Sequence, residues 1–184
     1  MLLHEIVTEI RRVQPPAGMS TRIVAVDGSG GAGKTSLSEW LAAEIPAQVV
    51  HTDDFASWEN PVDWWPDLVE KVLEPLAAGL AAHYVPTRWG GPERQEVTVE
   101  PGGFLILEGV TASREAFRPY LVYSIWIETP RHLRLRRGVA RDGEHMRAQW
   151  EEWMAAEDRY VEREQPAAHA DRVLPGDRDL WASS

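Results

Sequence analysis

The residues with the clearest chemical signature stand at positions 28–36, which read GSGGAGKTS. They contain the spacing G-x-x-x-x-G-K-[ST], whose glycines leave successive backbone N–H groups free to surround phosphate oxygens. A strand pattern at 22–27 precedes the loop and a helical pattern at 34–44 follows it, so the positive end of a helix adds to those groups. Lys34 is placed to reach the β- and γ-phosphates, and the Thr35 hydroxyl to coordinate Mg²⁺. The residues predicted to hold a nucleoside triphosphate are Gly28, Ser29, Gly30, Gly31, Ala32, Gly33, Lys34, Thr35 and Ser36.

Lysine usage supports this interpretation. Lys and Arg together number 19, but the only lysines are Lys34 and Lys71. A glycine-rich turn before a helix can carry this spacing by accident, yet an accident gives no reason for one of two lysines to stand at the required position.

A second group of polar residues follows the strand pattern at 47–51, in the segment His51-Thr-Asp53-Asp54-Phe55. Ligands of open α/β sheets bind at the carboxyl ends of strands. A carboxylate there can accept the proton of a substrate hydroxyl that attacks the γ-phosphate, or hold Mg²⁺ through water. The alternative is that the two aspartates only cap a turn or a short helix.

Glu108 follows the apolar run FLIL at 104–107. An acidic residue that ends a buried strand beside a phosphate loop is suited to organise a metal ion, because phosphoryl transfer depends on positioned charge. Gly109 then allows a close approach of the backbone. The alternative is that Glu108 is merely a solvated residue at a strand end.

A basic segment occupies residues 131–147, where six arginines face two acids. On a helix, Arg134, Arg137 and Arg141 share one face, and an anion between them would relieve their mutual repulsion. A helix that closes over the γ-phosphate would neutralise its charge and exclude water, so residues 131–147 are predicted to form a lid. The alternative is that the acidic residues of 151–164 neutralise the arginines in a structural layer of ion pairs.

The chain contains nine tryptophans and six histidines. Trp58, Trp64, Trp65 and Trp89 lie in a predicted insert at about 56–103, and they either stack on a planar or apolar substrate or pack within the protein. Packing is the expectation for Trp40, Trp126, Trp150 and Trp153. The histidines show no paired metal spacing, and His51 is expected to be structural. The predicted acceptor-side residues are Asp54, Trp58, Asp63, Trp64 and Trp89.

Composition excludes several classes of function. The length of 184 residues and the 43% of hydrophobic residues suit one globular domain. A net charge of −10 argues against an extended nucleic-acid surface, and no apolar run is long enough to span a membrane. The absence of cysteine excludes disulfides, thiolate zinc sites and thiol catalysis. We expect a cytoplasmic protein without nucleic-acid or membrane partners; its oligomeric state stays open, a homo-oligomer included.

Strand and helix patterns alternate along most of the chain, which predicts one α/β domain over residues 1–184 with a parallel sheet covered by helices on both faces. A loop or hairpin is expected at 83–103, where proline and glycine are frequent. The predicted strands are 22–27, 47–51, 104–107, 123–127 and 171–174, and the predicted helices are 3–13, 34–44, about 68–76, 131–141 and 146–164.

With these motifs, residues 22–175 resemble the uridine kinase and phosphoribulokinase-like branch of the P-loop kinases, which includes bacterial pantothenate kinase. The resemblance implies a three-layer P-loop fold with a helical lid. Asp53-Asp54-Phe55 matches the D-x-F of that family, which implies that Asp53 is the catalytic base. Glu108-Gly109 matches its E-G, whose acid is associated with Mg²⁺. Asp53 is also expected to contribute to the Mg²⁺ site.

The lid motif R-L-x-R-R-V-x-R-D of the family is similar to residues 134–142 here, which read RLRRGVARD. The match implies that Arg134, Arg137 and Arg141 clamp phosphates. Gly138 replaces an arginine of the motif, and the segment that holds the sugar hydroxyls in uridine kinases is rearranged at 58–65. The resemblance therefore implies the transfer machinery and leaves the acceptor undetermined.

The sequence thus predicts an ATP- and Mg²⁺-dependent kinase that phosphorylates a hydroxyl group of a small metabolite, with a nucleoside among the candidates. Lys34, Asp53, Arg137 and Arg141 are its predicted catalytic residues. Two alternatives stay open, a P-loop ATPase that drives a partner and a nucleotide-binding regulatory protein. The first needs a residue that positions water and a partner surface, and neither is identifiable in the sequence.

Overall fold

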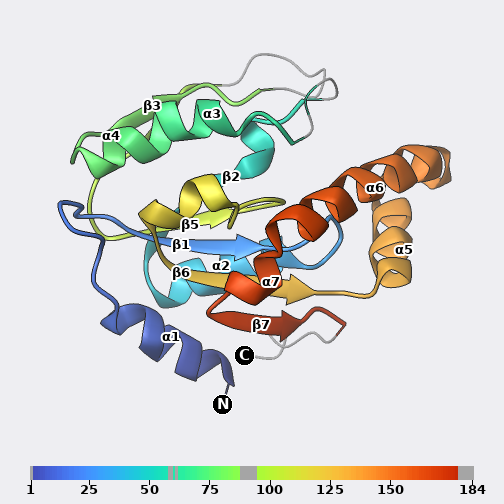
Figure 1. The fold of residues 1–184 in the computed structure, drawn as a ribbon, viewed down its shortest axis with the longest axis horizontal. Coiled ribbons are helices and arrows are strands. Elements are labelled where there is room, and N and C mark those ends of the chain that lie inside the picture. Colours follow the sequence, from blue (N-terminus) through green and yellow to red (C-terminus); the bar gives the residue numbers. More distant parts are fainter. Residues whose placement is uncertain (1, 58–59, 61, 88–94, 178–184) are drawn as a thin grey trace.

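A parallel sheet of five strands forms the centre of the molecule, in the order β2-β5-β1-β6-β7 (Figure 1). The computed structural model describes residues 2–57, 60, 62–87 and 95–177. Every neighbouring pair of strands in this sheet is parallel, as predicted. The strand bounds differ from the predicted ones by at most two residues at either end. The strands are β1 (Arg22–Asp27), β2 (Ala47–His51), β5 (Phe104–Glu108), β6 (Leu121–Glu128) and β7 (Arg172–Pro175).

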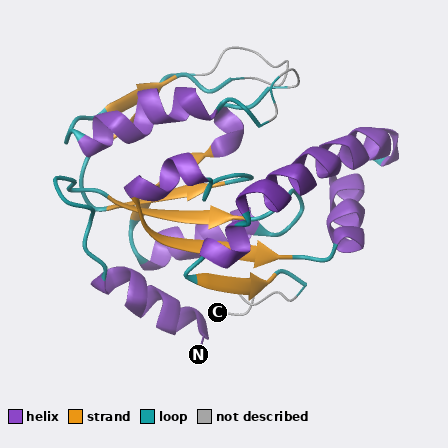
Figure 2. Ribbon diagram, viewed as in Figure 1, coloured by secondary structure: helices purple, strands orange, loops and turns teal. Residues whose placement is uncertain are grey.

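Both faces of the sheet are buried, because successive residues of a strand point to opposite sides. Ile23 and Ala25 of β1 belong to one apolar core, and Val24 and Val26 belong to another. Figure 2 shows helices on either side of the strands. The predicted three-layer α/β architecture is therefore confirmed. The core around Val24 is completed by α1 (Leu2–Arg12) and α2 (Lys34–Glu44).

The opposite core is covered by a helical segment at 65–77 and by a small hairpin. The helix contains a π-turn that ends two residues before Pro75, whose nitrogen has no hydrogen to donate. The two hairpin strands pair in antiparallel register, so of the two alternatives expected at 83–103, a loop or a hairpin, the structure has the hairpin pairing. The elements are α3 (Trp65–Leu68), the π-turn η2 (Val69–Leu73), α4 (Glu74–Ala77), β3 (Ala82–Tyr84), β4 (Val97–Val99) and the 3-10 helix η3 (Glu115–Tyr120).

Two helices, α5 and α6, project from the carboxyl edge of the sheet. In Figure 1 they lie on the side toward which the arrowheads of β1, β6 and β7 point. Gly143, with a φ of +99°, ends α5 and lets the chain turn back. Within the described part of the chain, no helix is both long and apolar enough to cross a bilayer. The segments are α5 (Arg131–Asp142), the 3-10 helix η4 (Glu144–Met146), α6 (Arg147–Glu164) and α7 (Pro166–His169).

Candidate functional site

The glycine-rich loop connects the end of β1 to the start of α2 in a conformation that suits an anion. Gly31 has a φ of +75°, and a Cβ atom there would lie 2.7 Å from the carbonyl oxygen of Arg134, so only glycine fits. Lys34 begins α2 and is 8% exposed, and its Nζ donates to the carbonyl oxygen of Ser29 at 3.2 Å. The loop therefore gathers backbone N–H groups, a helix N-terminus and one ammonium group at a single place.

A cavity of about 580 Å³ lies between this loop and the α5–α6 pair. Its volume falls within the range of sites for small ligands. It unites residues from the loop, from the ends of β2 and β5, and from both projecting helices. The predicted site residues that line it are Gly30, Gly31, Gly33, Lys34, Thr35, Ser36, Asp53, Glu108, Arg137 and Arg141. The other lining residues are Ala56, Val62, Val110, Gly138, Asp142, Met146, Trp150, Trp153, Ala156 and Glu157.

Asp53 faces this cavity from the 3-10 helix η1 (Thr52–Asp54), which directly follows β2. Its side chain is exposed to the cavity, and the surrounding walls desolvate it in part. This desolvation raises the pKa of Asp53, while the positive charge of Lys34 acts in the opposite direction. The nearby charge of Glu108 adds to the rise. Asp53 is therefore a more basic carboxylate than a solvated aspartate, and it lies within electrostatic reach of the phosphate-loop lysine.

Glu108 ends β5 beside the first turn of α2, as predicted. Its Oε1 accepts a hydrogen bond from Thr35 Oγ1 at 3.4 Å, and its Oε2 lies 2.6 Å from His51 Nδ1. The hydrogen bond with Glu108 raises the pKa of His51. Gly109 allows the close backbone approach that the sequence predicts, because a Cβ atom there would lie 1.8 Å from Thr52 Oγ1. A hydroxyl and a carboxylate oxygen are thus held side by side at the mouth of the loop.

This oxygen pair suits a metal ion that is shared with a nucleotide. Among the described residues, no group of three or more His, Cys, Asp or Glu side chains could hold a metal by itself. Mg²⁺ in phosphoryl-transfer sites usually takes only one or two protein oxygens and completes its shell with phosphates and water. The pair of Thr35 and Glu108 fits that pattern.

Two of the three predicted lid arginines reach the cavity. Arg137 donates from Nη1 to the carbonyl oxygen of Gly31 at 3.2 Å. Arg141 pairs with Asp142 at 2.8 Å, and its guanidinium lies 5.5 Å from the ring centre of Trp150. Arg137 therefore contacts the phosphate loop itself and Arg141 lines the same cavity, each through contacts that a bound anion can share or replace.

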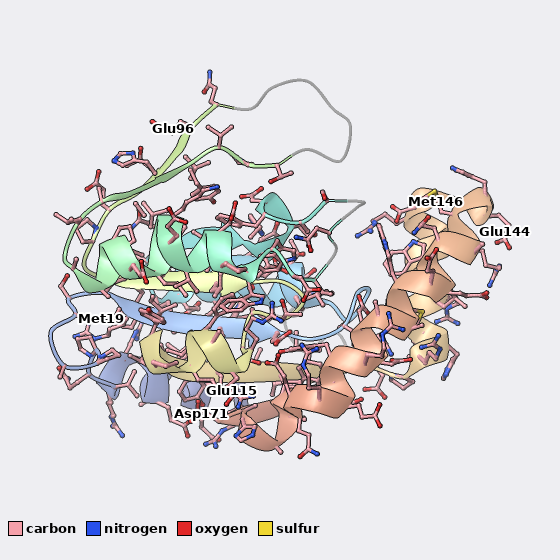
Figure 3. The ribbon with its side chains drawn as sticks, turned by 45° about the horizontal axis from the view of Figure 1, so that its top comes forward. Met19, Glu96, Glu115, Glu144, Met146 and Asp171 are labelled. Carbon is pink, nitrogen blue, oxygen red and sulfur yellow. The ribbon has the colours of Figure 1, made fainter. Side chains whose placement is uncertain are left out.

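The roof of the cavity is largely aromatic and apolar. Trp150, Trp153 and Met146 line it from η4 and α6, and Figure 3 shows Met146 at the end of the α5–α6 pair away from the sheet. Trp150 packs on Gly138, where a Cβ atom would lie 2.4 Å from the indole. The sequence predicts that Trp150 and Trp153 pack within the protein. The structure shows in addition that both line the cavity. The glycine that replaces an arginine of the lid motif makes room for Trp150.

Glu157, which sequence reasoning did not single out, also lines the cavity from α6. Its Oε1 accepts a hydrogen bond from the backbone N–H of Gly30 at 3.0 Å. Burial raises the pKa of Glu157, and the charge of Lys34 opposes that rise. The helical spacing of the sequence could have indicated that Glu157 lies near Trp150, because it follows Trp150 by two helical turns on the same face.

The same arrangement of sheet, loop and helices occurs in kinases of known structure. A possible uridine kinase from Bacillus stearothermophilus matches with a TM-score of 0.67 at 20% identity, over 95% of this chain and 100% of its own. A candidate fructose transport system kinase from Silicibacter sp. TM1040 matches with a TM-score of 0.68 at 19% identity, over 95% and 100%. This chain has the fold of the P-loop kinases.

A shikimate kinase from Bacteroides thetaiotaomicron shares the P-loop kinase fold at greater distance, with a TM-score of 0.51 at 15% identity over 87% of this chain and 90% of its own. No protein-family model matches the sequence, and no curated protein matches it. The fold expected from the sequence motifs is thus confirmed by structure. At these identities, the similarity shows the fold alone.

Arg134 departs from the prediction that it joins the other two lid arginines at the phosphates. It is 7% exposed and does not line the cavity. Its Nε donates to the carbonyl oxygen of Thr129 at 3.1 Å, and its Nη1 donates to Glu157 Oε2 at 3.2 Å. The alternative of a structural ion-pair layer therefore holds for Arg134, because its guanidinium pairs with the carboxylate of Glu157 on α6.

The predicted acceptor-side residues that the structure describes lie outside the cavity. Asp54 is buried and accepts a hydrogen bond from the Tyr84 hydroxyl at 3.0 Å. Trp64 packs against Phe55 and Phe117 in the core, which corrects its prediction as a substrate contact. Asp63 is exposed and is absent from the lining.

Trp58 and Trp89 lie outside the described residues. Within the nucleotide loop, the side chain of Ala32 packs in the core, and Gly28 and Ser29 lie outside the cavity lining. From the insert at 56–103, only Ala56 and Val62 reach the cavity among the described residues. Among the described residues, α6 therefore contributes more of the cavity lining than the insert does.

Proposed function

We propose that this protein is a kinase that transfers the γ-phosphate of ATP to a hydroxyl group of a small metabolite. One observation carries the proposal: a phosphate loop with its lysine, a hydroxyl–carboxylate pair suited to Mg²⁺ and a basic carboxylate all line one cavity. A nucleotide-binding protein without catalysis has no need for Asp53 opposite Lys34.

The phosphate loop would hold the triphosphate through its N–H groups and through Lys34. These donors are fixed before the nucleotide arrives, so little reorganisation is needed as charge develops on the transferred group. Arg137 and Arg141 lie on the opposite side and would neutralise that charge while the helices exclude water. When bound, Mg²⁺ held by Thr35 and Glu108 would supply further positive charge at the phosphates.

Asp53 would accept the proton of the attacking hydroxyl. Because desolvation raises its pKa, it binds that proton more firmly than a solvated aspartate would. In a loose phosphoryl-transfer transition state, the greater contribution is orientation of the nucleophile. Both roles require the acceptor hydroxyl to sit between Asp53 and the terminal phosphate.

The acceptor is proposed to have a planar or apolar body beside its hydroxyl group. Val62, Met146 and Trp153 all line the cavity and offer stacking and apolar contact rather than charge. Nucleosides are therefore candidates, together with other small alcohols.

An assay of ATP consumption with and without single acceptors tests the proposal. The panel contains nucleosides, pantothenate and small alcohols, and consumption is expected to require one of them. Asp53→Asn should abolish most of the acceptor-dependent rate, whereas Asp67→Asn, an exposed aspartate paired with Lys71 outside the cavity, should leave it unchanged. Turnover independent of any acceptor would favour an ATPase, and tight ATP binding without turnover would favour a regulatory protein.

A further inference from the structure

A carboxylate occupies part of the loop that is built for phosphate. Glu157 is 7% exposed, and its Oε1 accepts a hydrogen bond from the backbone N–H of Gly30 at 3.0 Å. Its Oε2 accepts from Arg134 Nη1 at 3.2 Å. The side chain thus fills an anion-binding position with the protein's own negative charge and holds a lid arginine at the same time.

The position of Glu157 is unusual because it brings a negative charge into a loop that is suited to bind anions. A buried carboxylate loses its hydration and must be compensated by nearby donors. Here the compensation comes from the Gly30 N–H, from Arg134 and from the charge of Lys34. Lys34 is the group that reaches the β- and γ-phosphates in loops of this kind. The carboxylate and the end of a triphosphate therefore draw on the same positive charge.

The helix that carries Glu157 is fixed to the loop on both sides of this contact. Trp150 packs on Gly30, where a Cβ atom would lie 2.9 Å from the indole. Tyr160 donates to Asp27 Oδ2 at 2.8 Å, directly before the loop. Glu157 lies between these two anchors on the same face of α6. Its carboxylate is thus delivered to Gly30 by the packing of a whole helix.

We propose that Glu157 is an internal anion that occupies the phosphate loop between turnovers and that the terminal phosphate of ATP displaces. Its departure would break the ion pair between Glu157 and Arg134 and leave Arg134 with Asp158 and the carbonyl oxygen of Thr129 as partners. A ligand that must displace an internal competitor binds with lower apparent affinity. Glu157 therefore lowers the affinity for triphosphates selectively and sets how strongly the site prefers ATP over ADP. The inference rests on the proposed nucleotide function.

Calorimetry of the purified full chain tests this with a non-hydrolysable ATP analogue and with ADP, both with Mg²⁺. Glu157→Gln keeps the shape of the side chain and removes its charge. We expect the Kd of the analogue to fall by about tenfold, equivalent to about 1.4 kcal/mol. The Kd of ADP should change by less than about twofold, because ADP lacks the phosphate that competes.

Asp158→Asn is the matched control. It removes the same charge from the next residue of α6, which pairs with Arg131 at the surface and also lies 3.8 Å from Arg134 Nη2, but makes no contact with Gly30. It should leave the ratio of the two dissociation constants as in the wild type. An equal gain in Asp158→Asn would mean that net charge or the loss of an Arg134 ion pair is responsible, and not the contact with Gly30, and would overturn the proposal.

Glu157→Asp is a second variant that keeps the test usable if Glu157→Gln does not fold, because it keeps a carboxylate partner for Arg134. Its side chain is one methylene shorter and cannot keep both contacts, so the analogue should bind about threefold more tightly. Unchanged or weaker analogue binding in whichever variant folds would show that Glu157 permanently supports the Gly30 peptide, and would overturn the inference. Failure of the wild type to bind either nucleotide would instead reject the proposed function.

Discussion

The floor and the roof of the cavity are built in different ways. The floor consists of the phosphate loop, Asp53 and Glu108, each of which lies at or just after the carboxyl end of a strand of the sheet. The roof consists of residues from α5 and α6, which reach the cavity only because the two helices pack back over the loop. The floor therefore depends on local backbone geometry, and the roof depends on contacts between distant parts of the chain.

The two parts also differ chemically. The floor gathers backbone N–H groups, an ammonium group and carboxylates, which suit charge transfer, whereas the roof combines two guanidiniums with Trp150, Trp153 and Met146. If this division is functional, changes in the floor should lower kcat, and changes in the roof should alter the binding of nucleotide or acceptor. The following variants test that division in order of expected effect.

Lys34→Ala should have the largest effect. Loss of a preorganised positive group at the transferred phosphate is expected to lower kcat by at least about 10³-fold. The chain should still fold, because the alanine keeps the first turn of α2. Steady-state kinetics and circular dichroism on the same preparation measure both. A variant with nearly normal turnover would mean that the phosphates bind elsewhere.

Asp53→Asn should lower turnover by about 10²-fold or more, the usual scale for loss of a general base. ATP affinity should stay within a few fold, because the change leaves the phosphate loop intact. Single-turnover rates and nucleotide titrations separate the two quantities. Turnover equal to that of the wild type would assign the proton transfer to another group.

Trp153→Leu should act on the roof alone. Loss of an aromatic wall is expected to raise the KM of the acceptor by up to about tenfold, with little change in kcat. Trp40→Leu is the control, because Trp40 packs from α2 against the core and does not line the cavity. A fall in kcat at constant KM would contradict the assignment of this wall to acceptor binding.

Tyr160→Phe should have the smallest effect and tests how the roof is attached to the floor. The lost hydroxyl donates to Asp27, which also accepts from Gly28 N–H at 2.6 Å. Loss of one buried hydrogen bond should cost about 1 kcal/mol and lower Tm by about 2–4 °C. The KM for ATP should rise a few fold as α6 loosens.

Tyr123→Phe is the matched comparison, because the Tyr123 hydroxyl donates to the carboxylate of Glu9 at 2.5 Å, outside the cavity lining. It should lower Tm without changing the KM for ATP. Equal effects of the two substitutions on KM would show that the Tyr160 contact has no particular connection to the nucleotide site.

The same division explains what the sequence could predict. The loop at 28–36, Asp53 and Glu108 are readable because a short motif and the end of a strand place them. Helical spacing correctly grouped the three lid arginines on one helix, but it could not reveal that Glu157, 23 residues further on, holds Arg134. The contact between Gly30 and Glu157 spans 127 residues, and no local pattern encodes it.

The residues on the acceptor side are harder to predict from the sequence, for a related reason. Trp64 was a plausible substrate contact by its place in the insert, yet it is buried with Phe55 and Phe117. An aromatic side chain fits a core as well as a ligand wall, and residue type alone does not choose between them. Tertiary packing makes the choice: Trp64 belongs to the core, and among the described residues α6 contributes Trp150 and Trp153 to the cavity lining.

The most direct test of the central claim follows the γ-phosphate itself. Phosphorus-31 NMR of the protein with MgATP and an acceptor identified by the consumption assay should show ADP and a new phosphate monoester rising together. That monoester should be absent with Asp53→Asn. Appearance of inorganic phosphate in place of a monoester, at a rate that no acceptor changes, would contradict the account.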